Sequence, residues 1–508
     1  MEKAYFMGVD IGTQGVRVGI ADVLGKMLVM VEVSYETDHP KFGWAEQDPE
    51  DWWQGFEKAV RYCVNAVGPE ISQNLKTLGV CGTSSTVLPM DIQGNPLSKA
   101  LLWMDTRSKR IADRINQTGH EVLKYCGGEV SAEWMIPKTL WIKENMREIY
   151  DKAYKIVEDI DFFNYRLTGI CCASINQAAC KWNYIEDKGG WNQEYFELIG
   201  LEDYKEKIPT IVKKVGEIVG PIKAELAEAL GLPKDILIIE GATDACQATI
   251  GNGVIVPGKL ATIMGTSFCH QAVCKEPIFQ QGIWGPFNKA LTDDTWMLEG
   301  GQISAGSITK WFIKEFNVTQ DKPYGYLANK AAEIPLGSDG VVVLDFFQGN
   351  RTPYKNSDLK GNIYGLTLKH TQFHIYRAIM EGIAFGMKNI LDNFGAQNYT
   401  IDTIVGSGGV TKNPVWLQII SDVTGAEVVV NECTDAGLLG HCIVGSVSAG
   451  IYENLEEAVD HMVHPKMTIV PNFENTKKYQ KVFERYIKIY ESLKDLMNED
   501  AEEEWINL

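Results

Sequence analysis

The feature of this sequence that most constrains its fold is a strand–turn–strand unit that occurs twice. Residues 5–11 form an apolar strand pattern, the turn Gly12-Thr13-Gln14-Gly15 follows, and residues 16–23 read as a second strand. The same order recurs in residues 260–264, the turn Gly265-Thr266-Ser267 and residues 268–273. Because the two copies lie about one domain length apart in a chain of 508 residues, the sequence predicts a duplicated α/β domain.

Each turn combines glycine with a hydroxyl side chain, which suits the binding of phosphate. Glycine lets backbone N–H groups approach a phosphate closely, and Thr13 adds a hydroxyl donor. The first turn is neither a Walker loop, because no Gly-Lys-Ser/Thr is present, nor a dinucleotide-binding fingerprint, because a strand follows it. One such turn would be an ordinary hairpin, but two that face each other across a cleft would clamp a polyphosphate, as in actin-like ATPases. Asp10, just before the first turn, could hold Mg2+ against that phosphate.

Asp244 is a candidate general base. Residues 236–239 are apolar and predict a buried strand, Gly241 ends that strand, and Asp244 precedes a small-residue stretch that could begin a helix. A carboxylate on a strand-to-helix turn is well placed to take a proton from a substrate. The alternative is a helix N-cap, a position that Asp favours, and this stretch considered alone favours the cap.

Three further segments carry side chains that could bind a small polar ligand. Ser84 and Ser85 lie among four consecutive hydroxyl residues, which the pattern places inside a strand. They could bond to a ligand or to the backbone. Trp103 ends an apolar strand and could stack on a sugar or fill the core. Lys181 lies between small and aromatic residues and could bind a substrate hydroxyl or be a surface lysine.

The second half contains a candidate adenine site. Residues 404–409 form a strand that runs into a glycine turn, and Asn413 then begins a helix. Such a turn can let a flat base lie on the backbone. Glu299 follows another strand pattern, and Gly306 lies at the start of the helix after it.

Charge and cysteine usage exclude several classes of function. The formal net charge of -19 repels phosphate backbones and anionic lipid, so we expect no binding of nucleic acid or of a membrane surface. The 11 cysteines form no Cys-x-x-Cys pair, which favours free thiols in a reducing compartment. The first residues contain no signal-peptide core, and no run is long and apolar enough to span a bilayer, so we expect a cytoplasmic protein.

Together these residues resemble the FGGY family of carbohydrate kinases over about residues 5–450. The strongest motif is the run 361–366, followed after seven residues by the run 374–381, a spacing that fits the family's second signature. The first signature is met in part, because Lys138 and Trp141 are kept but Thr139 stands where an apolar residue is usual. The resemblance implies the actin-like, duplicated ribonuclease-H fold, with two domains and a cleft between them.

The resemblance also implies a role for each candidate residue. Asp10 would orient magnesium and phosphate, and Asp244 would be the general base and not a helix cap. The first phosphate loop would be Gly12, Thr13 and Gln14, and the second would be Gly265 and Thr266. The adenosine pocket would contain Gly306, Gly408, Gly409 and Asn413. The substrate contacts would be Ser84, Ser85, Trp103, Lys181, Asp244 and Glu299. ATP and Mg2+ would be the cofactors. Relatives are often dimers, so the resemblance allows a homodimer.

Fewer residues indicate the sugar. Ser84-Ser85 stands where glycerol kinases carry Arg-Glu and xylulokinases carry Met-His, whereas the run 83–91 is similar to that of ribulokinases. Three further runs also favour the ribulokinases, namely residues 103–107, 180–182 and 299–302. The resemblance therefore favours ATP-dependent phosphorylation of the terminal hydroxyl of a ketopentose such as ribulose. Xylulose, erythrulose and erythritol stay open as substrates. The other alternative is a non-catalytic actin-like ATP-binding module.

The expected domain boundaries follow the two hairpins. We expect residues 1–254 to form an N-terminal sugar-binding actin-like domain and residues 255–470 a C-terminal nucleotide-binding actin-like domain. The break falls in the glycine-containing stretch 251–258. Residues 471–508 are expected to form a helical segment that ends in an acidic, solvated tail.

Overall fold

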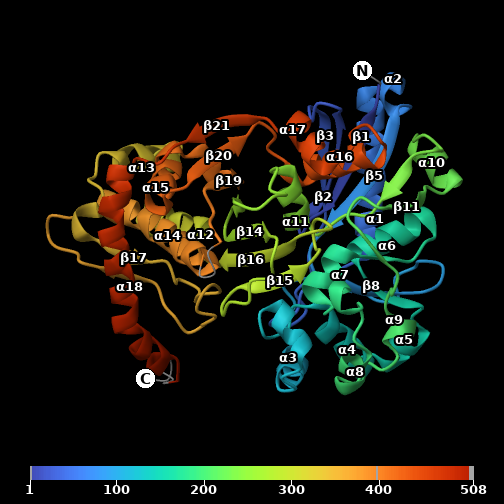
Figure 1. Cartoon of the computed structure of the whole chain (residues 1–508), viewed down its shortest axis with the longest axis horizontal. Coiled ribbons are helices and arrows are strands. Elements are labelled where there is room, and N and C mark those ends of the chain that lie inside the picture. Colours follow the sequence, from blue (N-terminus) through green and yellow to red (C-terminus); the bar gives the residue numbers. More distant parts are fainter. Residues whose placement is uncertain (1–2, 396–398, 503–508) are drawn as a thin grey trace.

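The computed structural model describes residues 3–395 and 399–502, which form two lobes (Figure 1). The first lobe is built on a sheet with the strand order β11-β12-β5-β1-β2-β3, and the second on a sheet with the order β15-β16-β14-β13-β19-β20-β21. The strands of the first sheet are β1 (Tyr5–Ile11), β2 (Gly15–Asp22), β3 (Met27–Ser34), β5 (Leu75–Gly82), β11 (Ile218–Pro221) and β12 (Leu237–Ile239). Those of the second are β13 (Lys259–Met264), β14 (Phe268–Cys274), β15 (Trp284–Asn288), β16 (Trp296–Gln302), β19 (Thr403–Ser407), β20 (Glu427–Asn431) and β21 (Pro465–Ile469).

Six strands of the second sheet repeat the topology of the first, and β15 adds a seventh strand antiparallel to β16. In the first, β1, β2 and β3 pair antiparallel, while β1 pairs parallel with β5 and β5 parallel with β12. In the second, β13, β14 and β16 pair antiparallel, while β13 pairs parallel with β19 and β19 parallel with β20. An antiparallel strand, β11 or β21, then extends the parallel end of each sheet. The duplicated domain predicted from the two hairpins is therefore confirmed.

Smaller strands and helices surround the two sheets. The other strands are β4 (Glu46–Gln47), β6 (Val87–Met90), β7 (Ala100–Leu101), β8 (Lys155–Glu158), β9 (Ala173–Ser174), β10 (Val212–Lys213), β17 (Val342–Leu344) and β18 (Asn362–Tyr364). The helices of the first half are α1 (Pro49–Val67), α2 (Pro69–Ser72), α3 (Lys109–Asn116), α4 (Met135–Asn145), α5 (Arg147–Lys152), α6 (Asp159–Thr168), α7 (Ile175–Lys181), α8 (Gln193–Leu198), α9 (Tyr204–Lys207), α10 (Ala224–Leu230) and α11 (Asp244–Gly251). Those of the second half are α12 (Gly306–Glu315), α13 (Pro323–Ala332), α14 (Gln372–Phe394), α15 (Pro414–Thr424), α16 (Ala436–Ser448), α17 (Leu455–Met462) and α18 (Phe473–Glu502).

The core of the first lobe contains residues from both halves of the chain. Helices α16 and α17 pack beside the N-terminal strands, as the orange-red and blue segments of Figure 1 show. Glycine permits the close approach of α16 to α11, because a Cβ added at Gly440 would lie 2.1 Å from the carbonyl oxygen of Gln247. A boundary at residue 254 therefore separates the strands of the two sheets along the chain. It does not separate the two cores, because helices α16 and α17 belong to the first core.

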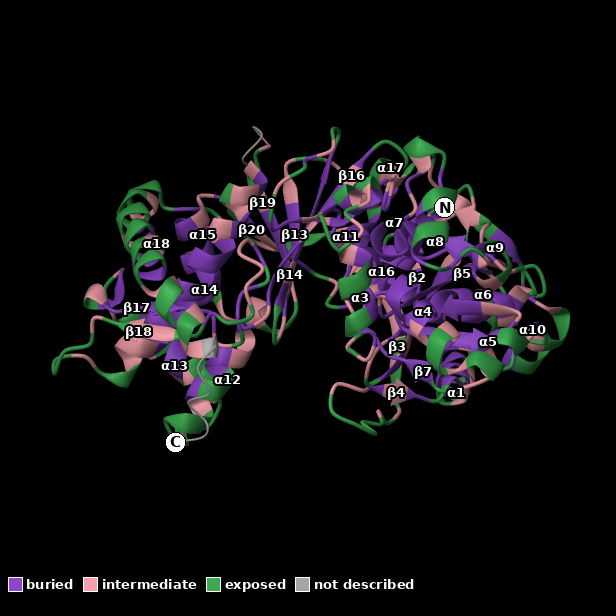
Figure 2. Cartoon of the chain, turned by 90° about the horizontal axis from the view of Figure 1, so that it is seen from below, coloured by how far each residue is buried: buried purple, intermediate pink, exposed green. Residues whose placement is uncertain are grey.

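Helix α18 is part of the core of the second lobe. Figure 2 shows buried residues gathered around the sheets and on the inner sides of the helices that cover them. Tyr486 of α18 donates to Asp345 Oδ1 at 2.7 Å, and Tyr479 donates to Glu381 Oε1 at 2.9 Å. The end of the expected acidic tail, residues 503–508, lies outside the described residues. Across the described ranges, no helix has both the length and the apolarity that crossing a membrane requires.

The four hydroxyl residues at positions 83–86 are not inside a strand, so that prediction is wrong. Strand β5 ends before them, and β6 begins after them in a different sheet. Ser85 has φ of 65°, and its N–H donates to Glu158 Oε2 at 2.7 Å. Lys138 Nζ donates to the Ser85 carbonyl at 2.8 Å. Buried polar side chains from α4 and β8 thus hold a turn that strand propensity could not indicate.

Candidate active site

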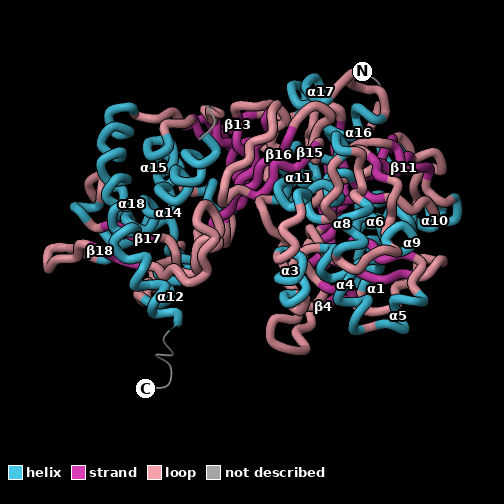
Figure 3. The backbone as a smooth tube through the Cα atoms, turned by 60° about the horizontal axis from the view of Figure 1, so that its bottom comes forward, coloured by secondary structure: helices cyan, strands magenta, loops and turns pink. Residues whose placement is uncertain are grey.

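The turn between β13 and β14 lies between two cavities. Met264, Gly265 and Thr266 line the larger cavity, which has a volume of about 650 Å³. Ile263 and Ser267 line the smaller cavity, which has a volume of about 300 Å³. Both volumes lie within the range typical of small-molecule sites. Figure 3 shows the strands of the second sheet on the side of the second lobe that faces the first. A phosphate at this turn would therefore lie between two adjacent ligand sites.

Asp244 lines the smaller cavity as the first residue of α11. The N-cap of this helix is Thr243, so Asp244 is not the cap that its own stretch favoured. Its Oδ1 accepts from the N–H of Ala245 at 2.6 Å. Burial, and then the negative charge of Asp10, raise the pKa of the Asp244 carboxyl to about 7. At neutral pH a carboxyl with this pKa is partly ionised, so it can act as a base. Its raised pKa also makes it a stronger proton acceptor than an ordinary aspartate.

Lys181 and Glu299 form an ion pair at the wall of the same cavity. Their Nζ and Oε1 atoms lie 3.6 Å apart, and Gln271 Nε2 donates to Glu299 Oε2 at 2.9 Å. The Lys181 ammonium lies 4.7 Å from the ring centroids of both Trp134 and Trp284. Burial acts against the charge of Glu299, but Lys181 and Gln271 outweigh it and lower the pKa of the Glu299 carboxyl. Lys181 is therefore a charged group of the cavity and not the surface lysine of the alternative interpretation.

Ser84, Ser85 and Trp103 also line the smaller cavity. Within the part of the chain that the structure describes, the buried hydroxyl oxygens of Ser84 and Ser85 have no hydrogen-bond partner. Buried polar atoms normally have a partner, so both hydroxyls fit a role in ligand binding. Trp103 is 37% exposed and is not a core residue. Its Nε1 donates to Thr13 Oγ1 at 3.0 Å, which connects the cavity to the first hairpin.

The first hairpin presents a carboxylate that fits a divalent cation. Asp10 is only 2% exposed, and its Oδ2 accepts from Arg17, which lies opposite it in the β1–β2 register. Arg17 also donates to Asp435 Oδ2 at 2.9 Å. The Oδ1 of Asp10 is buried and has no partner among the described residues. Magnesium prefers oxygen ligands and is often bound through one or two carboxylates plus phosphates and water, so this free oxygen fits Mg2+.

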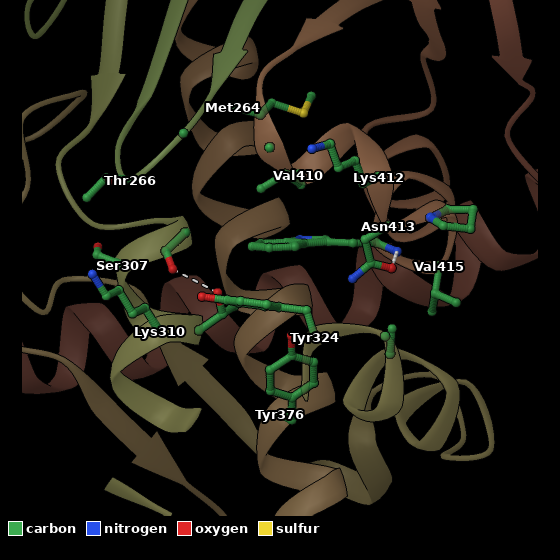
Figure 4. A pocket seen from close by; sticks show the side chains of 18 of the residues that line it. Met264, Thr266, Ser307, Lys310, Tyr324, Tyr376, Val410, Lys412, Asn413 and Val415 are labelled. Carbon is green, nitrogen blue, oxygen red and sulfur yellow. Dashed lines mark hydrogen bonds between the residues drawn. The ribbon is translucent and has the colours of Figure 1, made fainter. Parts of the chain in front are cut away.

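The larger cavity lies beside the turn after β13 and at the start of α12. The carbonyl of Thr266 accepts from the N–H of Ser307 at 3.0 Å, and a Cβ added at Gly306 would lie 2.3 Å from the carbonyl oxygen of Gly265. Glycine at 306 therefore allows α12 to begin directly against the turn. Figure 4 shows Ser307 and Lys310 on one side of the cavity and Asn413 and Val415 on the other. Aromatic residues complete the lining, namely Tyr324, Tyr376 and Trp416.

The tertiary structure brings together most of the residues that the sequence indicated. The smaller cavity collects Ser84, Ser85, Trp103, Lys181, Asp244 and Glu299, and the larger collects Gly265, Thr266, Gly306, Gly409 and Asn413. The lining of these two cavities does not include Asp10, Gly12, Thr13, Gln14 or Gly408. Gly408 instead packs beside β13 with φ of 95°, where an added Cβ would lie 2.7 Å from the Met264 carbonyl oxygen.

Several site residues escaped sequence reasoning. Arg17 could have been found, because the hairpin register places it opposite Asp10 and opposite charges favour cross-strand pairing. The others come from segments distant in the chain, and no local pattern marks them: Glu133, Trp134, Trp284 and Arg351 in the smaller cavity, and Lys310, Tyr324 and Lys412 in the larger.

Two family models together match most of the chain. The N-terminal domain of the FGGY family of carbohydrate kinases matches residues 5–251, and the C-terminal domain of that family matches residues 260–449. A relative from Homo sapiens, named FGGY carbohydrate kinase domain-containing protein, is 31% identical over 98% of each chain. A ribulokinase from Shouchella clausii is 30% identical, over 96% of this chain and 95% of the relative. The structure of xylulose kinase from Rhodospirillum rubrum matches with a TM-score of 0.89 at 20% identity, over 97% of this chain and 100% of that chain, and so has the same fold.

Proposed function

Because the chain belongs to the FGGY family of carbohydrate kinases, which are ATP-dependent phosphotransferases, we propose that its acceptor is a ketopentose such as ribulose, phosphorylated at its terminal hydroxyl. In this proposal the smaller cavity binds the sugar and the larger binds the adenosine of ATP. The hydroxyl-rich turn at Ser84 and the ribulokinase name of one relative both support a ketopentose.

The observation that carries the proposal is the position of Asp244, at the start of α11 and in a sugar-sized cavity. As the terminal hydroxyl oxygen of the sugar forms its bond to the γ-phosphorus of ATP, its proton passes to the Asp244 carboxylate. The bond between the γ-phosphorus and the β,γ-bridging oxygen breaks, and ADP leaves. Ser84, Lys181 and Glu299 would hold the sugar hydroxyls in place, because a reaction of this kind depends mostly on positioning.

The two hairpins would hold the phosphates from opposite sides. Gly12, Thr13 and Gln14 form one turn, and Gly265 and Thr266 form the other. Asp10 would hold Mg2+, which when bound neutralises charge on the phosphates. The ion pair with Arg17, which also contacts Asp435, keeps the Asp10 carboxylate oriented. Gly306, Gly408, Gly409 and Asn413 would shape the adenosine end of the nucleotide site.

The test is a coupled ADP-release assay on a panel that contains both ribulose isomers, xylulose, erythrulose, erythritol and glycerol. We expect sugar-dependent ADP release that is highest with one ribulose isomer and that falls at least a hundredfold in Asp244→Asn. Highest turnover on xylulose would support a ketopentose kinase but refute ribulose as its substrate. Highest turnover on a tetrose or a polyol would support a kinase but refute a ketopentose substrate. ADP release that does not depend on sugar would favour an ATP-binding module.

A further inference from the structure

We propose that Lys138 and Glu158 are positioning residues for the sugar, because together they fix three segments of the wall of the smaller cavity. Those segments carry Ser85, Trp103 and Lys181, which all line that cavity, whereas its lining includes neither Lys138 nor Glu158. The proposal rests on the proposed function, because it takes the smaller cavity as the sugar site.

Lys138 holds two of these segments by their backbone. It lies on α4 and is fully buried. Its Nζ donates to the carbonyl of Ser85 at 2.8 Å and to the carbonyl of Leu102 at 2.6 Å. A longer hydrogen bond, from the Trp103 N–H to Thr86 Oγ1 at 3.3 Å, joins the same two segments. Because Leu102 directly precedes Trp103, Lys138 connects the Ser85 turn to the segment that carries the indole.

Glu158 connects the Ser85 turn to the end of α7. It is fully buried at the end of β8. Its Oε2 accepts from the Ser85 N–H at 2.7 Å and from Gln177 Nε2 at 2.8 Å, and its Oε1 accepts from Trp182 Nε1 at 2.5 Å. Gln177 lies within α7, and Trp182 follows Lys181, the last residue of that helix. Glu158 therefore fixes the helix end that carries the Lys181 side chain.

The contacts of Lys138 and Glu158 meet at the backbone of Ser85. A φ of 65° places this residue in the left-handed region, which costs free energy for residues other than glycine. Its N–H donates to Glu158 and its carbonyl accepts from Lys138, so both backbone polar groups are bound in this conformation. Its hydroxyl oxygen, like that of Ser84, has no partner among the described residues. The two buried side chains thus hold the turn and leave its hydroxyls available to a ligand.

Other parts of the site have anchors of their own. The start of α7 is held on the loop before Asp244, because Ser174 Oγ donates to the Gly241 carbonyl at 2.6 Å and Asn176 Oδ1 accepts from the Thr243 N–H at 3.0 Å. The residues that line the larger cavity all come from the second half of the chain. Loss of either positioning residue should therefore displace sugar contacts but leave the base and the larger cavity in place.

The experiment compares the wild-type protein with Lys138→Met and Glu158→Gln. Met keeps the length of the side chain but donates no hydrogen bond, and Gln keeps only one acceptor oxygen. Lys143→Met is the matched control, because Lys143 lies on the same helix and donates to the Gly200 carbonyl at 2.9 Å, outside the lining of the cavity. We would measure kcat, the KM for the best ketopentose and for ATP, and the Kd of each from tryptophan fluorescence, because tryptophans line the smaller cavity.

The expected pattern separates the sugar from the nucleotide. In Lys138→Met and Glu158→Gln the KM and Kd for the sugar should rise about 10- to 100-fold, since small displacements of several contacts reduce binding and orientation by such factors. The KM and Kd for ATP should stay within about twofold, which also shows that each variant is folded, and Lys143→Met should change none of these values. A sugar Kd within about twofold of wild type would overturn the proposal for that residue, and equal weakening of sugar and ATP would indicate a general structural role and overturn it as well.

The substitution Trp182→Phe tests the same contacts if Lys138→Met or Glu158→Gln does not fold. It removes only the donor to Glu158 Oε1 and keeps an aromatic ring in the core. Trp191→Phe is its matched control, because Trp191 packs near Trp182 but donates to the Thr210 carbonyl at 3.1 Å. The sugar Kd should rise about three- to tenfold in Trp182→Phe alone, and equal values in the two variants would overturn the proposal. A wild-type protein that neither binds nor turns over a sugar would instead refute the proposed function.

Discussion

The substitution Asp244→Asn should lower kcat but raise the free energy of unfolding. Asn keeps the size of the side chain and an acceptor for the Ala245 N–H, which Asp244 Oδ1 receives at 2.6 Å. It cannot take a proton from the sugar at neutral pH. General-base catalysis contributes about 10²- to 10⁴-fold, so kcat should fall by that factor while the KM for ATP changes little.

The stability effect follows from the raised pKa of Asp244. Burial and the charge of Asp10 raise that pKa from 3.8 to about 7 in the folded protein. Below pH 3.8 the carboxyl is protonated in the folded and unfolded states, so it contributes no difference. As pH rises, the unfolded state ionises first, and the full penalty on folding is reached above about pH 7.

This difference in pKa corresponds to about 4 kcal/mol, but the side chain is only partly buried, and screening by solvent reduces the value to about 2 kcal/mol. The start of α11 opposes the penalty, because a negative charge at a helix N-terminus is stabilising by about 0.3–1 kcal/mol. The penalty is the larger effect. We therefore expect Asp244→Asn to raise the free energy of unfolding by about 1–2 kcal/mol at pH 8 and to have little effect at pH 4.

Urea unfolding, followed by tryptophan fluorescence at pH 4, 6 and 8, would measure this effect beside the coupled kinase assay. Asp113→Asn is a matched control, because Asp113 lies exposed on α3, away from the cavity. The reasoning fails if Asp244→Asn keeps near-wild-type kcat, since another group would then be the base. It also fails if the variant is less stable than wild type at pH 8, since Asp244 would then be a stabilising helix-terminal charge.

Three other predictions concern the general base, the larger cavity and the packing of the first lobe. The kcat/KM for the sugar should rise with pH through an apparent pKa of about 7 and then level off, because only the ionised Asp244 accepts a proton; a profile that is flat across this range would count against the base. Gly306→Ala should raise the KM for ATP about tenfold without changing sugar binding in the fluorescence assay, because its Cβ would lie 2.3 Å from the carbonyl oxygen of the second phosphate loop. Gly440→Ala should lower the free energy of unfolding by about 1–3 kcal/mol, since its Cβ would lie 2.1 Å from the Gln247 carbonyl oxygen. Gly395→Ala, where the space is open, is the control in urea unfolding, and equal stability of the two variants would refute the close packing of α11 on α16.

The most reliable sequence predictions concerned short segments whose chemistry is local. The glycine turns, the helix that begins after Asn413 and the apolar strand before Asp244 each depend on neighbouring residues. Asn413 caps its helix by accepting from the N–H of Trp416 at 3.1 Å, three positions further along the chain. Such features recur wherever the same residues occur in the same order, because short-range hydrogen bonds and allowed dihedral angles produce them.

The turn that contains Ser84 and Ser85 shows where local reasoning failed. Propensity favours a strand through these residues, but Lys138 and Glu158 bind the backbone of Ser85 and divert the chain into another sheet. Those two partners lie 53 and 73 residues away. Satisfying buried polar groups is a tertiary effect, and it exceeds the small preference of each residue for a strand.

The sequence by itself determined the duplicated domain, because the repeated hairpins are visible as a pattern, and it placed Asp244 just after a buried strand. Only the tertiary structure decided which groups act on those residues. Arg17 joins Asp10 to Asp435, which follows more than 400 residues later, and Arg351 reaches the smaller cavity from the second lobe. These contacts depend on how two sheets and helix α16 pack together, and packing is governed by shape and burial over the whole molecule, which no local pattern records.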